Sequence, residues 1–107
     1  MIRYADERWN ELRFTKFSYQ VECRDEQWVD VELKVETDVD TPLPDDVIDY
    51  AIMAICTHRG DPLQFVVLEE GCDSEYQLTA EEKEQLEAFL RRDEVQAAIR
   101  AAAAQNG

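Results

Sequence analysis

Three cysteines and a single histidine are the side chains of this sequence best suited to metal binding. Cys23, Cys56, His58 and Cys72 supply the thiolate and imidazole groups that zinc takes in tetrahedral sites. Their spacing is unlike any compact zinc motif, and the apolar pattern around Cys23 and Cys56 assigns both thiols to the protein interior. We therefore expect neither a metal nor another cofactor.

The same residues are a poor basis for thiol catalysis. A nucleophilic cysteine needs a nearby base and a third group that orients this base. Cys56 and His58 lie two positions apart on a predicted helix, so their side chains point about 200° apart around its axis. The sequence also lacks a Gly-rich phosphate loop and a Gly-x-Ser-x-Gly motif. A small metal-dependent or thiol enzyme is therefore the weakest hypothesis, and we expect no enzyme.

An acidic connector is the other candidate metal site. Glu36, Asp38, Asp40, Asp45 and Asp46 carry the oxygen ligands that hard divalent cations prefer. The segment lacks the glycine and the terminal glutamate of a calcium-binding EF-hand loop, and it contains two prolines. We interpret it as a stiff, solvated linker.

Negative charge is the strongest feature of the composition. The 107 residues include 25 acidic and 11 basic side chains, which gives a net charge of −14. Nearly all of the excess falls between residues 25 and 90. Such a field repels nucleic acids and anionic membranes and favours basic protein surfaces, although solubility alone explains it equally well.

Two strands are predicted from the alternation of apolar and polar residues. Residues 14–23 and 28–36 both alternate, which is typical of half-buried strands in a hairpin. We prefer a five-residue loop, or an equivalent bulge, because a four-residue loop would place inward residues opposite outward ones. The expected pairs are Cys23 with Val29, Val21 with Val31, Tyr19 with Leu33, and Phe17 with Val35.

A central helix is predicted between Pro44 and Gly60. The apolar side chains of Ile48, Ile52 and Ile55 recur at helical spacing, and a glycine followed by Pro62 favours a helix end. The opposite face of this helix would carry Asp46, Asp49, Tyr50, Met53 and Thr57.

The remaining segments complete an α+β domain over residues 1–107. Residues 63–68, apolar on both faces, predict a covered and central strand. A capping box at Thr79 and Glu82 predicts a helix over residues 80–90. Asp93 and Gln96 repeat this pattern, so residues 94–104 form either a separate helix or a continuation kinked near Arg92. A short N-terminal helix is expected from the spacing of Ile2, Ala5, Trp9 and Leu12.

We expect the outward carboxylates of the hairpin, the connector and the central helix to form one acidic surface. Duplex DNA presents a negative charge about every 1.7 Å, so ordered carboxylates could occupy a groove built for phosphates. Aromatic and Met side chains within this surface would act as apolar anchors, or would simply pack under the terminal helices. The predicted partner-binding residues are Glu22, Trp28, Asp30, Glu32, Glu36, Asp38, Asp40, Asp46, Asp49, Tyr50 and Met53.

These features predict a non-enzymatic domain that binds a basic, nucleic-acid-binding protein partner and not nucleic acid itself. In size and charge the chain resembles small phage-encoded inhibitors of bacterial defence systems, including some anti-CRISPR proteins. This resemblance of type implies an inhibitor that acts as a DNA mimic, and it carries over no site residue.

The alternative is an adaptor that self-associates through the apolar helix face. We expect a monomer or homodimer, a cytoplasmic location and no membrane contact, because no signal or membrane-spanning segment is evident.

Overall fold

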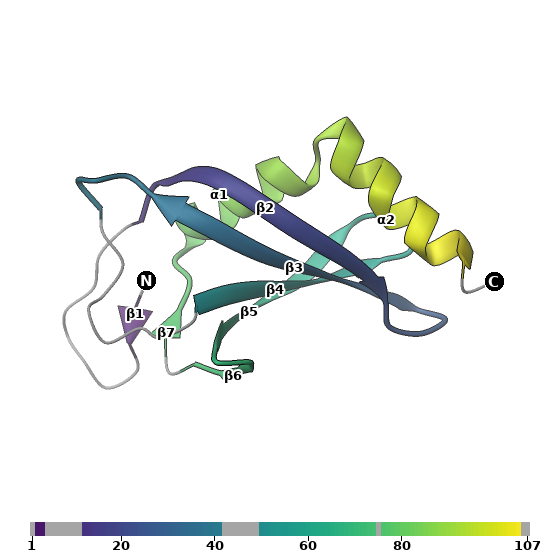
Figure 1. Cartoon of the computed structure of the whole chain (residues 1–107), viewed down its shortest axis with the longest axis horizontal. Helices are drawn as coiled ribbons and strands as arrows, with labels where there is room; N and C mark the ends of the chain where they lie inside the picture. The colour runs from purple at the N-terminus through teal and green to yellow at the C-terminus, as the bar shows by residue number, and fades with distance from the viewer. Residues whose placement is uncertain (1, 4–11, 42–49, 75, 106–107) are drawn as a thin grey trace.

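The computed structural model shows an α+β fold in which two C-terminal helices pack on an antiparallel five-stranded sheet (Figure 1). The structure describes residues 2–3, 12–41, 50–74 and 76–105. The sheet order is β2-β3-β4-β5-β6, and β1 pairs separately with β7. The strands are β1 Ile2–Arg3, β2 Phe14–Cys23, β3 Trp28–Thr37, β4 Tyr50–Thr57, β5 Pro62–Glu69, β6 Cys72–Asp73 and β7 Tyr76–Gln77, and the helices are α1 Ala80–Leu90 and α2 Asp93–Gln105.

The β2–β3 hairpin has the predicted register. Cys23 lies opposite Val29, and the pairing continues without a shift to Phe17 opposite Val35. In the loop, the Asp25 carboxylate accepts hydrogen bonds from the backbone N–H groups of Gln27 at 2.8 Å and Trp28 at 2.9 Å. This local turn lets the hairpin close without a glycine.

The predicted central helix is wrong for residues 50–57, which form β4 in the middle of the sheet. Both faces of this strand are apolar, so its sequence satisfies helical spacing as well as strand spacing. β4 lies between β3 and β5. Backbone pairing with both neighbours favours the strand over the helix for these residues. Residues 44–49 of the predicted helix lie outside the described residues.

The predicted helix end at Gly60 is a turn between β4 and β5. Gly60 has a φ of +96° and donates its backbone N–H to the Thr57 carbonyl at 2.9 Å. A glycine with positive φ followed by a proline is compatible with a turn between strands as well as with the end of a helix. The Gly60–Pro62 signal therefore did not distinguish between the two.

The N-terminal helix is not shown. Ile2–Arg3 form β1, which pairs with Tyr76–Gln77, so no helix begins at Ile2. Residues 4–11 lie outside the described residues. Leu12, the last member of the predicted helical face, is non-helical and almost fully buried.

β5 confirms the predicted third strand but not its central, covered position. It lies between β4 and the two-residue β6, only Val67 among its residues is buried, and Leu63 is 57% exposed. Glu70 and Gly71 both have positive φ and form the two-residue connection to β6.

The C-terminal helices pack on one face of the sheet and close the core. The predicted capping box is confirmed, since Thr79 and Glu82 each accept a backbone hydrogen bond from the other residue. α2 is a separate helix.

Gln96 links the two helices to the β4–β5 turn, because its Nε2 donates to the carbonyls of Leu90 at 2.7 Å and Gly60 at 3.0 Å. The fully buried side chains at this interface are Val29, Val31, Leu33, Ile52, Ala54, Cys56, Leu86, Leu90, Val95 and Ile99.

Candidate protein-binding surface

The sheet face opposite the two helices, here called the open face, carries most of the predicted carboxylates of the hairpin. Alternation along β3 places Val29, Val31 and Leu33 against the helices, so the residues between them point the other way. Among the predicted partner-binding residues, those placed on the open face by the β2–β3 register are Glu22, Trp28, Asp30, Glu32 and Glu36.

β4 and β5 add an apolar stripe to the open face. Met53 lies opposite Glu32 on one side and Val66 on the other. Ile55 lies opposite Asp30, and all three apolar side chains are half-buried. Met53 is among the predicted partner-binding residues, but Ile55 and Val66 are not, because only the pairing of β4 with β5 brings these three side chains together.

Tyr50 does not belong to the open face. It shares the parity of Ile52 on β4, so its ring lies on the helix side. Its hydroxyl is buried and has no hydrogen-bond partner. Burial raises the pKa of this hydroxyl far above its usual value, and the nearby Glu82 carboxylate adds to the shift. Tyr50 is therefore a core residue and not the exposed anchor that helical spacing predicted.

Basic residues interrupt the row of carboxylates. The Asp30 Oδ2 accepts a hydrogen bond from Arg24 Nε at 2.8 Å, while its Oδ1 is buried without a partner. Lys34 lies between Glu32 and Glu36 on β3. Lys34 and Glu32 also line a depression of about 230 Å³ with Gln20 and Ser18. The described part of the open face is thus mixed in charge, with an acidic excess, and is not a uniform row of negative groups.

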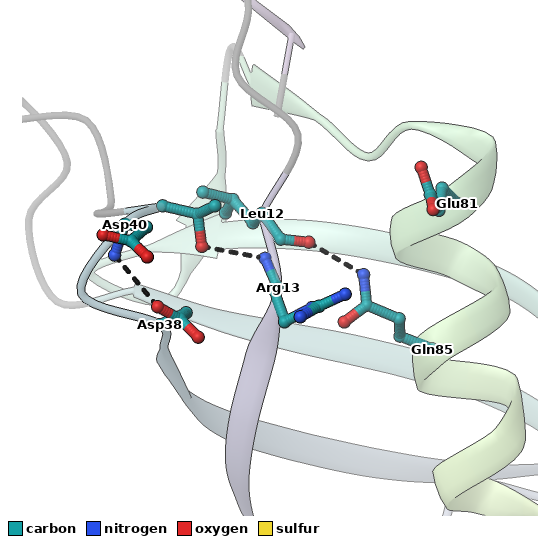
Figure 2. A pocket seen from close by; sticks show the side chains of 7 residues that line it. Leu12, Arg13, Asp38, Asp40, Glu81 and Gln85 are labelled. Atoms are coloured by element: carbon teal, nitrogen blue, oxygen red, sulfur yellow. Dashed lines mark hydrogen bonds between the residues drawn. The ribbon is translucent and has the colours of Figure 1, made fainter.

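Asp38 and Asp40 lie away from the open-face stripe, beside a second depression of about 250 Å³ (Figure 2). The Asp38 Oδ1 accepts the Asp40 backbone N–H at 3.0 Å, which closes the turn after β3. Arg13 lines this depression from the position just before β2, and Glu81 and Gln85 line it from α1. These acids have a local structural role in the turn. The predicted residues Asp46 and Asp49 lie outside the described residues.

The cysteines and His58 do not assemble a metal site in the described part of the chain, where no cluster of three or more His, Cys, Asp or Glu residues could hold an ion. His58 follows β4 rather than ending a helix. Its Nε2 lies 2.8 Å from the Asp25 carbonyl and 3.9 Å from Cys23 Sγ. A carbonyl only accepts hydrogen bonds, so this nitrogen carries a proton and cannot take one from the Cys23 thiol.

Cys56 is unsuited to nucleophilic chemistry for another reason. Burial raises the pKa of its thiol to about 11, and the nearby Asp30 carboxylate acts in the same direction. The thiolate is the reactive form, so Cys56 is unreactive near neutral pH. Cys72 is exposed and lies opposite Glu69 in the β5–β6 pairing.

Comparison with protein-family models, curated proteins and solved structures found no match. Within the described residues, no helix is both long and apolar enough to cross a membrane.

Proposed function

We propose that this chain is a non-enzymatic protein-binding domain whose binding surface is the open face of the sheet. The observation that carries the proposal is the apolar stripe of Met53, Ile55 and Val66 directly beside the carboxylates of Asp30 and Glu32. An apolar centre with a polar rim is the usual composition of a protein interface. The stripe is continuous because Met53 and Ile55 follow one another on the same face of β4, and Val66 lies directly opposite Met53 on β5.

The partner surface that fits this face is basic around an apolar patch. Asp30 and Glu32 lie along one side of the stripe, and the chain carries a net charge of −14. A positive partner would be drawn to this field and would associate faster at low salt. Met53 and Trp28 would provide the contact area that exposed charge pairs alone do not supply.

DNA mimicry is a narrower form of the same proposal. It requires that the partner's basic surface normally binds nucleic acid, and it does not require the carboxylates to reproduce phosphate spacing. Arg24 and Lys34 lie within the described row, so recognition through apolar contacts and acidic rim together is better supported than a phosphate-like row. Self-association through the predicted helix face has less support, because residues 50–57 form a strand and Tyr50 and Met53 lie on its opposite faces.

Affinity capture with matched variants tests the proposal. Glu32→Lys combined with Met53→Glu should reduce recovery of specific native partners at least about tenfold, since it reverses the rim charge and buries a new charge in the stripe. Glu84→Lys, on the exposed side of α1, repeats the Glu-to-Lys exchange of the double variant away from the open face and should leave capture intact. Circular dichroism confirms that each variant is folded.

Two outcomes separate the general proposal from the narrower one. Equal recovery by the double variant and by the unmodified chain would contradict binding through the open face. If duplex DNA displaces a captured partner, this chain binds at the partner's nucleic-acid site, as mimicry requires. If DNA does not displace it, mimicry is wrong and protein binding stands.

A further inference from the structure

β2 forms one border of the sheet, with β3 as its neighbour on the inner side (Figure 1). The Arg24 backbone N–H donates to the Trp28 carbonyl at 3.0 Å, which continues the ladder between the two strands. In an antiparallel pair the bonded positions alternate, so the even-numbered residues of β2 bond to β3. The backbone groups of Phe17, Tyr19 and Val21 therefore point to the outer edge, where no described strand pairs with them.

This edge is long, regular and electrically neutral within an acidic chain. β2 contains ten residues but only one acid, Glu22, and one base, Lys16. Short strands, bulges and several charges usually protect sheet edges from association. β2 has a register shift only at its first residues, between Phe14 and Lys16. A second copy would therefore meet less repulsion here than along the acidic remainder of the molecule.

Lys16 and Glu22 are both available for a partner. Each is exposed, and neither forms an ion pair with another described residue. Glu22 lies directly opposite Asp30, which is a like-charge pair, and Asp30 already binds Arg24. A cation beside the outer edge of β2 would relieve this repulsion.

We propose that two copies of the chain pair antiparallel through β2, with Tyr19 at the two-fold axis. In this register Lys16 lies opposite Glu22 of the partner subunit, and the two-fold axis repeats the ion pair. Phe17 lies opposite Val21 of the partner subunit, so the outward backbone groups of both strands meet in bonding positions. The pairing joins two five-stranded sheets into one continuous sheet.

Other registers are less favourable. A shift of one residue would place the helix-side residues of one copy opposite open-face residues of the other. A shift of two residues in one direction sets Lys16 against Arg24 of the partner subunit, and in the other direction it sets Lys16 against Gln20 of the partner subunit. Only the register centred on Tyr19 forms both opposite-charge pairs. The rings on the helix side also hold the strand in place, since Phe17 stacks on Phe89 at 4.4 Å between ring centroids.

Charge exchange tests the register. Sedimentation of the full chain at rising concentration should give twice the 12.5 kDa mass of one copy. Lys16→Glu and Glu22→Lys should each raise the dissociation constant of the dimer about tenfold or more, because each sets like charges opposite one another. The double exchange restores complementarity with unchanged net charge and should restore the dimer.

Amide hydrogen exchange locates the interface. Phe17, Tyr19 and Val21 should gain protection as the concentration rises, while Ser18 and Gln20, already bonded to β3, should not change. A chain that stays monomeric at millimolar concentration would overturn the proposal, as would a dimer unaffected by Lys16→Glu. Partner capture by the open face does not depend on this result, because a Lys16→Glu monomer retains the stripe of Met53, Ile55 and Val66 and the carboxylates of Asp30 and Glu32.

Discussion

Glu82 shows how one side chain can serve two levels of structure. The sequence predicted its role in the capping box of α1, which is a local pattern. Its Oε2 also accepts the backbone N–H of Leu12 at 2.7 Å, and this contact spans seventy positions of the chain. The sequence gives no sign of that second bond, because it depends on where the segment before β2 passes α1.

Tyr50 allows a test at the same scale. Its buried hydroxyl has no hydrogen-bond partner, so Tyr50→Phe should raise the free energy of unfolding at pH 7 by about 1 kcal/mol. The raised pKa adds a pH dependence. Above about pH 10 the unfolded chain ionises Tyr50 while the folded chain keeps the proton, so the folded state loses stability there.

Urea unfolding of both proteins at pH 7 and above pH 10 measures the effect. The advantage of Tyr50→Phe should grow with pH, because phenylalanine cannot ionise in the unfolded chain. The lysines, cysteines and other tyrosines titrate equally in both proteins and cancel in the difference. A difference that stays constant with pH would show that the Tyr50 pKa is not raised in the folded protein.

Elements differ in how far their sequences determine them. The alternation of β2 and β3 is compatible only with strands, so it predicted their register and the face of Asp30 and Glu32. The apolar residues of β4 fit a helix and a strand equally well, and pairing with β3 and β5 decided between them. For this reason the sequence misplaced Tyr50 and did not reveal the stripe that Ile55 and Val66 form with Met53.

The two strand turns provide a matched prediction at this scale. Gly60 and Gly71 both have positive φ, but a Cβ on Gly60 would collide with the Gln96 side chain, whereas one on Gly71 would meet open space. Gly71→Ala should cost about 1 kcal/mol from backbone strain alone, and Gly60→Ala should cost about 2–4 kcal/mol. Thermal unfolding compares the two. Equal losses of stability in the two variants would contradict the prediction. They would mean that Gln96 of α2 and the β4–β5 turn move apart without cost to make room for the new Cβ.

Charge acts on the molecule as a whole. The net charge of −14 lies on a body with a radius of gyration of 14.0 Å, so its carboxylates repel one another across the fold at low ionic strength. The Debye length falls from about 30 Å at 0.01 M salt to about 3 Å at 1 M. The described ion pairs at Arg24 and Arg91 are partly exposed. Their attraction therefore adds little stability to offset the repulsion among the carboxylates.

We therefore expect sodium chloride to stabilise the folded chain. Between 0.01 M and 0.5 M salt at pH 7, the free energy of unfolding should rise by about 1–3 kcal/mol, since each unscreened pair of like charges 10 Å apart costs about 0.4 kcal/mol in water. Urea unfolding at each salt concentration measures the change. The same titration near pH 4.2, where the net charge approaches zero, is the control and should show little salt dependence. A fall in stability with salt at pH 7 would mean that attractive ion pairs outweigh the net repulsion, and the acidic excess would then be balanced within the fold rather than open to a basic partner.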